Sequence, residues 1–182
     1  IEPNVGIVEV PDARMAALAE IVKPQRMQYA ITEFVDIAGL VRGASKGEGL
    51  GNKFLGNIRE VDAIIHVIRC FEDENILRDE GAINPISDKE IIDTELQLKD
   101  LESVEKKIQR NEKLAKLDPK LKAELEVLQL CKSHLEKGKS IRELEFSKED
   151  RNAIADLFLL TEKPVLYVAN VDEASMHTGN KF

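Results

Sequence analysis

The sequence of 182 residues contains no tryptophan, and aromatic side chains make up only 4% of it. A surface that binds single-stranded nucleic acid by stacking its bases is therefore not expected. The two cysteines, Cys70 and Cys131, lie far apart without metal-ligand spacing, and we interpret both as ordinary buried thiols. Neither a signal peptide nor an apolar run of twenty residues is present, so we expect a cytoplasmic protein without membrane contact.

The sequence also lacks the phosphate-binding pattern G-x-x-x-x-G-K-[ST]. The nearest spacing runs from Gly51 to Gly56, and Asn57 and Ile58 follow it in place of lysine and a hydroxyl residue. The loop formed by that pattern supplies the backbone N–H groups around the α and β phosphates, and its lysine contacts the β and γ phosphates. Residues 1–182 by themselves therefore offer no such phosphate cradle.

The charge of the chain is acidic, with a net charge of −8 and a pI of about 5.1. This balance argues against nonspecific binding of nucleic acid through overall charge, and we expect no specificity for DNA sequences. A local basic face stays compatible with the composition. The length suits one domain with an insertion.

Hydrophobic periodicity predicts strands that alternate with helices. Residues 62–70 are almost continuously apolar, which is typical of a parallel strand covered on both faces, and residues 71–90 are predicted to be a loop. Asp12 is a suitable N-cap, and Ser147 with Asp150 forms a capping-box pattern. The alternation predicts an α/β fold whose mostly parallel sheet is flanked by helices. The expected strands are residues 1–10, 28–36, 62–70 and 164–169, and the expected helices are residues 13–22, 52–60 and 147–161.

A different pattern occupies the middle of the chain. Leucine and isoleucine recur at helical spacing on both sides of Pro119, with charged residues between them. This pattern predicts an antiparallel α-helical coiled-coil hairpin, which we expect to project as a separate lobe. We place it at residues 85–140, inserted into a nucleotide triphosphatase domain made of residues 1–84 and 141–182.

The most informative stretch is residues 36–52, which begin at the end of a predicted strand. Asp36 and Gly39 have the D-x-x-G spacing of nucleotide triphosphatases. An aspartate at a strand end can hold Mg²⁺, usually through a water molecule. A glycine three residues later lets its backbone approach a γ-phosphate and offer an N–H group.

The whole run, D-I-A-G-L-V-R-G-A-S-K-G-E-G-L-G-N, resembles the signature of Obg-type P-loop NTPases. Together with E-P-N-V-G-I-V at residues 2–8 and N-V-D-E at residues 170–173, it makes the chain similar to the YchF/Obg-like ATPase family over essentially its whole length. The resemblance implies a Ras-like P-loop NTPase domain with Mg²⁺ as cofactor and ATP, with GTP also possible, as substrate. Its partners would be the ribosome or RNA.

The same resemblance implies that residues 1–182 are an internal part of a longer protein. In the family the P-loop and the Mg²⁺-binding switch threonine come before the segment that matches Ile1, and a TGS domain follows the nucleotide-binding domain. The P-loop strand would lie between the strand that ends at Asp36 and the strand at residues 63–70. We expect residues 1–182 alone not to form a stable ATP-binding domain.

Asn170, Val171, Asp172 and Glu173 follow a predicted strand, where ligands bind in open α/β sheets. The corresponding motif of Ras-like GTPases is N-K-x-D, whose aspartate accepts hydrogen bonds from guanine. Here valine replaces the lysine and glutamate replaces the aspartate, a change that the resembled family shares and that is associated with ATP over GTP. We therefore expect these four residues to bind the nucleotide base, although a plain polar loop would fit them alone.

Leu40 stands where Ras-like enzymes carry the glutamine that orients the attacking water. A leucine side chain cannot form a hydrogen bond, so another group must position the water, and we assign only Gly39 and Leu40 to the catalytic site. Family members often carry a histidine in the loop after the strand at residues 62–70. This chain has Arg78 at that position, which leaves the water-positioning group open.

These observations favour a Mg²⁺-dependent ATPase that acts as a regulatory switch. Two alternatives stay open. One is a GTP-binding protein with guanine preference, and the other is a noncatalytic protein-binding or RNA-binding module centred on the helical hairpin. Competition between GTP and ATP distinguishes the ATPase from the GTP-binding protein. Nucleotide titration distinguishes the ATPase from the noncatalytic binding module.

The aspartate at the strand end gives a direct test. We predict that Asp36→Ala abolishes Mg²⁺-dependent hydrolysis in the full-length protein, because it removes the only carboxylate assigned to the metal. The measurement is phosphate release at saturating Mg²⁺. Unchanged turnover would show that residues 36–52 have been misassigned.

Overall fold

The structure is a computed structural model, and it describes residues 4–37, 50–73, 75–76, 81–114 and 119–182. The chain divides into two compact units, Ile1–Gly39 and Leu40–Phe182, which are considered separately. Among the described residues, no helix is both long enough and apolar enough to cross a membrane.

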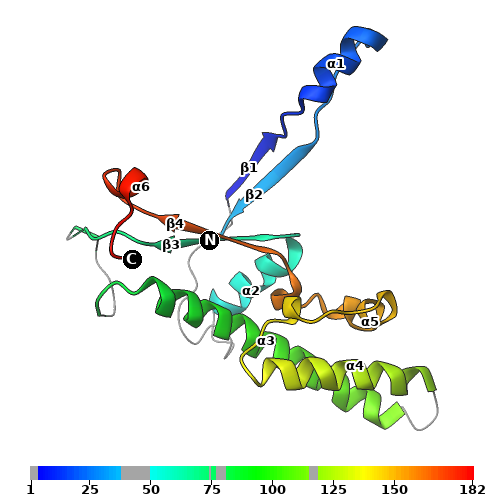
Figure 1. The fold of residues 1–182 in the computed structure, drawn as a ribbon. Coiled ribbons are helices and arrows are strands. Elements are labelled where there is room, and N and C mark those ends of the chain that lie inside the picture. The colour runs from blue at the N-terminus through cyan, green and yellow to red at the C-terminus, as the bar shows by residue number, and fades with distance from the viewer. Residues whose placement is uncertain (1–3, 38–49, 74, 77–80, 115–118) are drawn as a thin grey trace. The chain divides into compact units, whose positions relative to one another are not determined.

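The helices and strands follow one another along the chain as drawn in Figure 1. The first unit contains β1 (Asn4–Glu9), α1 (Ala13–Val22) and β2 (Ile31–Asp36). The second unit contains α2 (Leu50–Glu60), β3 (Ile64–Arg69), α3 (Pro85–Leu114), α4 (Pro119–Leu135), the 3₁₀ helix η2 (Ile141–Glu143), α5 (Lys148–Ile154), the 3₁₀ helices η3 (Ala155–Leu157) and η4 (Leu160–Glu162), β4 (Val165–Asn170) and α6 (Ser175–Thr178).

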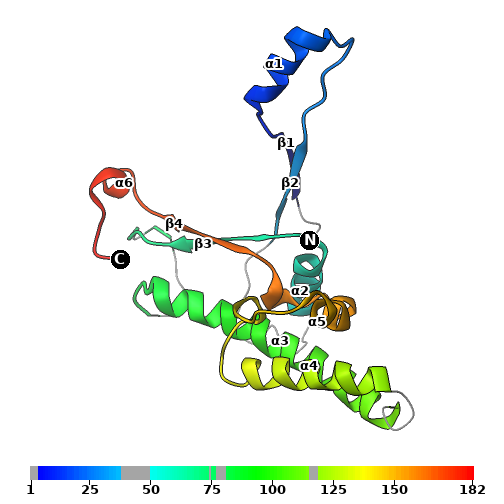
Figure 2. The same ribbon diagram turned by 45° about the vertical axis from the view of Figure 1, so that its right-hand side comes forward.

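In the first unit, β1 and β2 form an antiparallel pair, with Asn4 opposite Asp36 at one end of the register. The expectation of a mostly parallel sheet is wrong for this pair. The physical reason is that α1 lies beyond the ends of both strands, so the chain returns beside β1 in the opposite direction (Figures 1 and 2). The helix predicted at residues 13–22 is confirmed. Asp12 caps it by accepting a hydrogen bond of 2.9 Å from the Arg14 N–H group.

In the second unit, β3 and β4 form a parallel pair, with Ile64 opposite Val165. Helix α3 runs along one face of this pair (Figures 1 and 2). On the other face Ile65 and Val67 are 47% and 58% exposed, and Leu166 is 60% exposed. The expected parallel direction of β3 is confirmed, but the expectation that both faces are covered is wrong for the described residues of this unit, because helices lie against one face only.

The best-packed part of the second unit is the pair of helices α3 and α4. They lie side by side, and residues 141–162 pack against them to complete a core. The predicted division into residues 1–84 with 141–182 and an insertion at 85–140 stays a prediction. In the structure, the segment that follows residue 140 shares the core of the two long helices. That core consists of Val104, Ile108, Leu128, Cys131, Leu135, Ile141, Ile154 and Leu159.

Helices α3 and α5 show how the local sequence determines where a helix begins. The sequence pattern predicts a loop over residues 71–90, but α3 already begins at Pro85. Proline is well suited to the first helical position, and the Asn84 side chain accepts a hydrogen bond of 3.1 Å from the Ser87 N–H group. The capping box of Ser147 and Asp150 is confirmed, although α5 ends at Ile154 and gives way to 3₁₀ turns before the predicted end near residue 161.

A buried carboxylate fastens η4 to α3. The side chain of Asp100 is fully buried and accepts hydrogen bonds from the N–H group of Leu160 at 2.8 Å and from the N–H and hydroxyl groups of Thr161, both at 2.7 Å. Burial raises the pKa of Asp100, while these hydrogen bonds act in the opposite direction. Because η4 comes just before β4, the contact fixes where β4 starts.

Ion pairs around the buried Lys107 fasten the middle of the hairpin. The ammonium group of Lys107 on α3 contacts Glu124 on α4 at 2.6 Å, Asp156 on η3, and the carbonyl oxygen of Ala153 at 2.8 Å. The side chain of Lys107 is only 7% exposed, and a buried ammonium group without partners is costly, whereas that of Asp156 is 58% exposed. The cluster joins three elements at one lysine.

The Asp100 contact yields a prediction about stability. Asp100→Ala leaves three donors in the core without their acceptor, and each unsatisfied buried donor costs about 1–3 kcal/mol. We expect the free energy of unfolding in urea to fall by about 3 kcal/mol or more. Glu112→Gln on an exposed part of α3 is the matched control. A loss no larger than that of the control would contradict the assignment of Asp100 as an anchor.

Candidate functional site

A cavity of about 390 Å³ lies at the carboxyl ends of β3 and β4. Ligands of open α/β sheets bind at this end of the strands. The expected base-binding residues Asn170, Val171, Asp172 and Glu173 all line the cavity, together with Val67, Val168, Ala169 and Met176. The structure therefore brings these four residues to one concave site.

Of the two carboxylates in this segment, that of Asp172 is already used inside the loop. It accepts hydrogen bonds from the N–H group of Ser175 at 2.7 Å and from the Ser175 hydroxyl at 2.9 Å. These bonds lower the pKa of Asp172. The side chain of Asp172 thus holds the first turn of α6 and is not directed to a ligand.

The carboxylate of Glu173 is different. It is exposed, and among the described residues no hydrogen bond or ion pair engages it. Val171 and Met176 supply apolar surface beside it, and Met176 is 70% exposed. The site therefore offers the Glu173 carboxylate as an acceptor next to an apolar wall, which suits a flat heterocycle that carries a hydrogen-bond donor.

The loop that follows β3 is organised by a residue that sequence reasoning missed. The guanidinium of Arg69 donates to the carbonyl oxygens of Phe71 at 3.1 Å, Asp73 at 3.3 Å and Ile76 at 3.3 Å. It also lies 4.8 Å from the centre of the Phe71 ring. The only sequence signal was an arginine at the end of an otherwise apolar strand. Arg69 shapes this loop beside the end of β4.

The other expected site residues are less fully described. Asp36 is the last residue of β2, and its side chain is exposed within the first unit. One exposed carboxylate at a strand end fits Mg²⁺, which binds few protein ligands and keeps water and phosphate oxygens. No cluster of three or more metal-ligating side chains occurs among the described residues. Gly39, Leu40 and Arg78 lie outside the residues that the structure describes.

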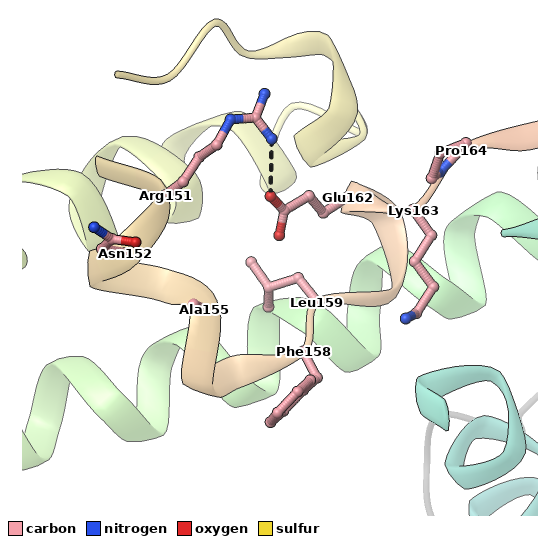
Figure 3. Close-up of a pocket in the computed structure, with 8 residues that line it drawn as sticks. All are labelled: Arg151, Asn152, Ala155, Phe158, Leu159, Glu162, Lys163 and Pro164. Carbon is pink, nitrogen blue, oxygen red and sulfur yellow. Dashed lines mark hydrogen bonds and ion pairs between the residues drawn. The ribbon is translucent and has the colours of Figure 1, made fainter. Parts of the chain in front are cut away.

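A second cavity, of about 460 Å³, lies between α5 and the start of β4 (Figure 3). Its charged groups already have partners. Arg151 pairs with Glu162 at 3.3 Å, and Lys163 donates to the carbonyl oxygens of Arg59 at 3.1 Å and Val61 at 2.6 Å. The second cavity is therefore a poorer candidate than the one beside Glu173, and Lys163 acts instead to hold the end of α2.

Comparison with known proteins identifies the family of the chain. Residues 16–171 match the family model described as 50S ribosome-binding GTPase, and the chain belongs to this family. Its fold is that of a Ras-like P-loop GTPase.

The more particular matches are proteins named YchF. The chain is 56% identical over 174 residues to the ribosome-binding ATPase YchF of Escherichia coli O157:H7, covering 95% of this chain and 48% of that protein. It is 52% identical over 184 residues to the protein of the same name from Bacillus subtilis strain 168, covering 100% and 50%. The solved YchF GTPase of Schizosaccharomyces pombe superposes with a TM-score of 0.80 at 39% identity, covering 100% and 50%.

The resemblance to the YchF/Obg-like ATPase family, first seen in residues 2–8, 36–52 and 170–173, is confirmed by these matches. The chain spans about half the length of the curated relatives it matches.

The role of Arg69 can be tested directly. Arg69→Met removes the donors that hold three carbonyl groups, so we expect faster amide hydrogen exchange in residues 71–76, with a smaller effect for Arg69→Lys. Exchange is followed by mass spectrometry on the full-length protein. Arg14→Met is the control, because Arg14 is exposed and pairs locally with Asp12. Equal exchange in Arg69→Met and the unmodified protein would exclude the proposed hold on the loop.

Proposed function

We propose that the full-length protein is a Mg²⁺-dependent P-loop ATPase that acts as a regulatory switch on the ribosome. The observation that carries this proposal is the free carboxylate of Glu173 beside the cavity at the ends of β3 and β4. The names of the YchF relatives, which describe ribosome-binding ATPases, support it.

The preference for ATP follows from the chemistry of the bases. Guanine presents two neighbouring N–H donors that a short, correctly placed aspartate accepts together, and a lysine stem packs over the base. Val171 lacks that stem, and the longer Glu173 places its carboxylate differently. One carboxylate oxygen is sufficient to accept a hydrogen bond from the exocyclic amino group of adenine. The residues present thus lack the pair that reads guanine and can accept from adenine, which supports the proposed preference for ATP.

We assign the proposed contacts with the phosphates to residues 36–40 of the sequence. Asp36 would hold Mg²⁺, and the bound metal would neutralise charge on the phosphate oxygens. Gly39 would offer its N–H group to the γ-phosphate. Leu40 cannot orient a water molecule, so the water-positioning group is another residue of the full-length protein.

A ribosomal partner is proposed from the name of the relatives and would place the protein in the cytoplasm. The chain has a net charge of −8, so contact with ribosomal RNA would need a local basic face. Contact through ribosomal proteins is equally compatible with this charge.

GTP is the second candidate substrate. The matching family is described as a ribosome-binding GTPase, and the YchF protein of Schizosaccharomyces pombe is also named a GTPase. A third candidate is a noncatalytic binding module centred on α3 and α4, because these helices form a core of their own with residues 141–162. Titration of the full-length protein with ATP and GTP decides among the three.

We predict that the unmodified full-length protein binds ATP more tightly than GTP in the presence of Mg²⁺. The double substitution Val171→Lys with Glu173→Asp restores the guanine-reading pair and should shift the ratio of the two dissociation constants toward GTP by about tenfold or more. Isothermal titration calorimetry gives both constants.

The control for this experiment is Glu149→Asp, an equally conservative change at an exposed position of α5. It should leave the ratio unchanged. A strong preference of the unmodified protein for GTP would contradict the ATPase proposal in favour of the GTPase. Failure to bind either nucleotide would favour the binding module.

A further inference from the structure

We propose that Asn180 is a positioning residue for nucleotide selectivity, because its side chain closes the segment that carries Glu173 onto the end of β3. We call residues 171–179 the base-reading loop. The inference rests on the proposed function, since it assigns a role in discriminating between bases.

The two ends of the base-reading loop are bound to the backbone of one residue, Cys70. The N–H group of Cys70 donates to the carbonyl oxygen of Asn170 at 2.7 Å, where β4 ends. After the loop, the side-chain amide of Asn180 donates to the carbonyl oxygen of Cys70 at 2.8 Å. The two hydrogen bonds therefore close residues 170–180 into a ring at the backbone of Cys70, which directly follows β3.

The orientation of the Asn180 amide follows from its second contact. Its Oδ1 atom accepts a hydrogen bond of 3.0 Å from the N–H group of Phe182, so its Nδ2 group faces Cys70. The side chain must donate on one side and accept on the other. An amide meets both requirements, whereas a carboxylate of the same size can only accept.

Within the ring, the loop is bonded to itself. Asp172 caps Ser175, and the N–H group of Gly179 donates to the Ser175 carbonyl oxygen at 2.9 Å. Gly179 has a φ angle of 73°, which other residues rarely adopt, and this turn leads the chain back to Cys70. Because these bonds lie within the loop, they do not set its placement against β3, which depends on the two attachments to Cys70.

Glu173 depends on that placement. Its carboxylate has no bond to another described residue, so only the backbone of the loop sets its position beside Val67 and Val168. Hydrogen-bond strength falls steeply with poor distance and angle, so a loosened loop weakens base discrimination. The phosphates, whose proposed contacts are at residues 36–40, would lose little.

The neighbouring residue supplies a matched control. Lys181 forms an ion pair of 2.6 Å with Glu72, and both side chains are about two-thirds exposed, at 65% and 64%. Exposed pairs of this kind contribute little. Lys181→Ala thus changes the same segment without touching the ring.

The experiment measures the dissociation constants of ATP and GTP, each with Mg²⁺, for the full-length protein and three variants. Asn180→Asp removes the donor without changing size, Asn180→Ala removes it without adding charge, and Lys181→Ala is the control. We expect both Asn180 variants to bring the ratio of the two constants closer to one by about threefold to tenfold, the equivalent of one hydrogen bond. Lys181→Ala should stay within about twofold of the unmodified protein.

Two results would overturn the inference alone, in a protein that itself discriminates between the nucleotides. One is an unchanged ratio, with or without an equal loss of affinity for both nucleotides. The other is an effect confined to Asn180→Asp, which would be due to the added charge. An unmodified protein that binds neither nucleotide would overturn the proposed function, and this inference with it.

Discussion

The parallel pairing of β3 with β4 is the constraint on which the rest of the second unit depends. A parallel pair cannot be joined by a tight turn, so the chain must cross over between the two strands, and α3, α4 and the 3₁₀ turns occupy that crossover. Asp100 fixes the returning chain at Thr161, just before β4 begins. The pairing then places Arg69 and Asn170 at the same end of the sheet, where their loops meet.

Much of this arrangement can be predicted from the sequence, because strands and helix starts have local sequence patterns. The apolar runs that became β3 and β4, and the capping box at Ser147, are predicted by periodicity and side-chain chemistry. The direction of pairing between β1 and β2 is not, since alternation of strands and helices carries no information on where a helix lies relative to the strands. The start of α3 at Pro85 was missed because proline marks both loops and first helical turns.

In the candidate site, too, the sequence predicts the segment but not the contacts of each side chain. Sequence identifies Asn170–Glu173 as a unit but cannot assign separate tasks to its two carboxylates. The structure separates them, since Asp172 is bound to Ser175 and the Glu173 carboxylate has no partner within the described part of the chain. A serine three residues after an aspartate is a recognised capping pattern and could have indicated this. The contacts of Arg69 and Asn180 with backbone carbonyl groups leave no comparable pattern, because they depend on the path of the chain.

The central claim is that Glu173 faces the base of a bound adenine nucleotide at the ends of β3 and β4. The most direct measurement is a crystal structure of the full-length protein with Mg²⁺ and a nonhydrolysable ATP analogue. The account predicts the adenine ring against Val171 and Met176, with its amino group within hydrogen-bond distance of the Glu173 carboxylate. Adenine bound elsewhere, for example in the cavity beside Arg151, would contradict it.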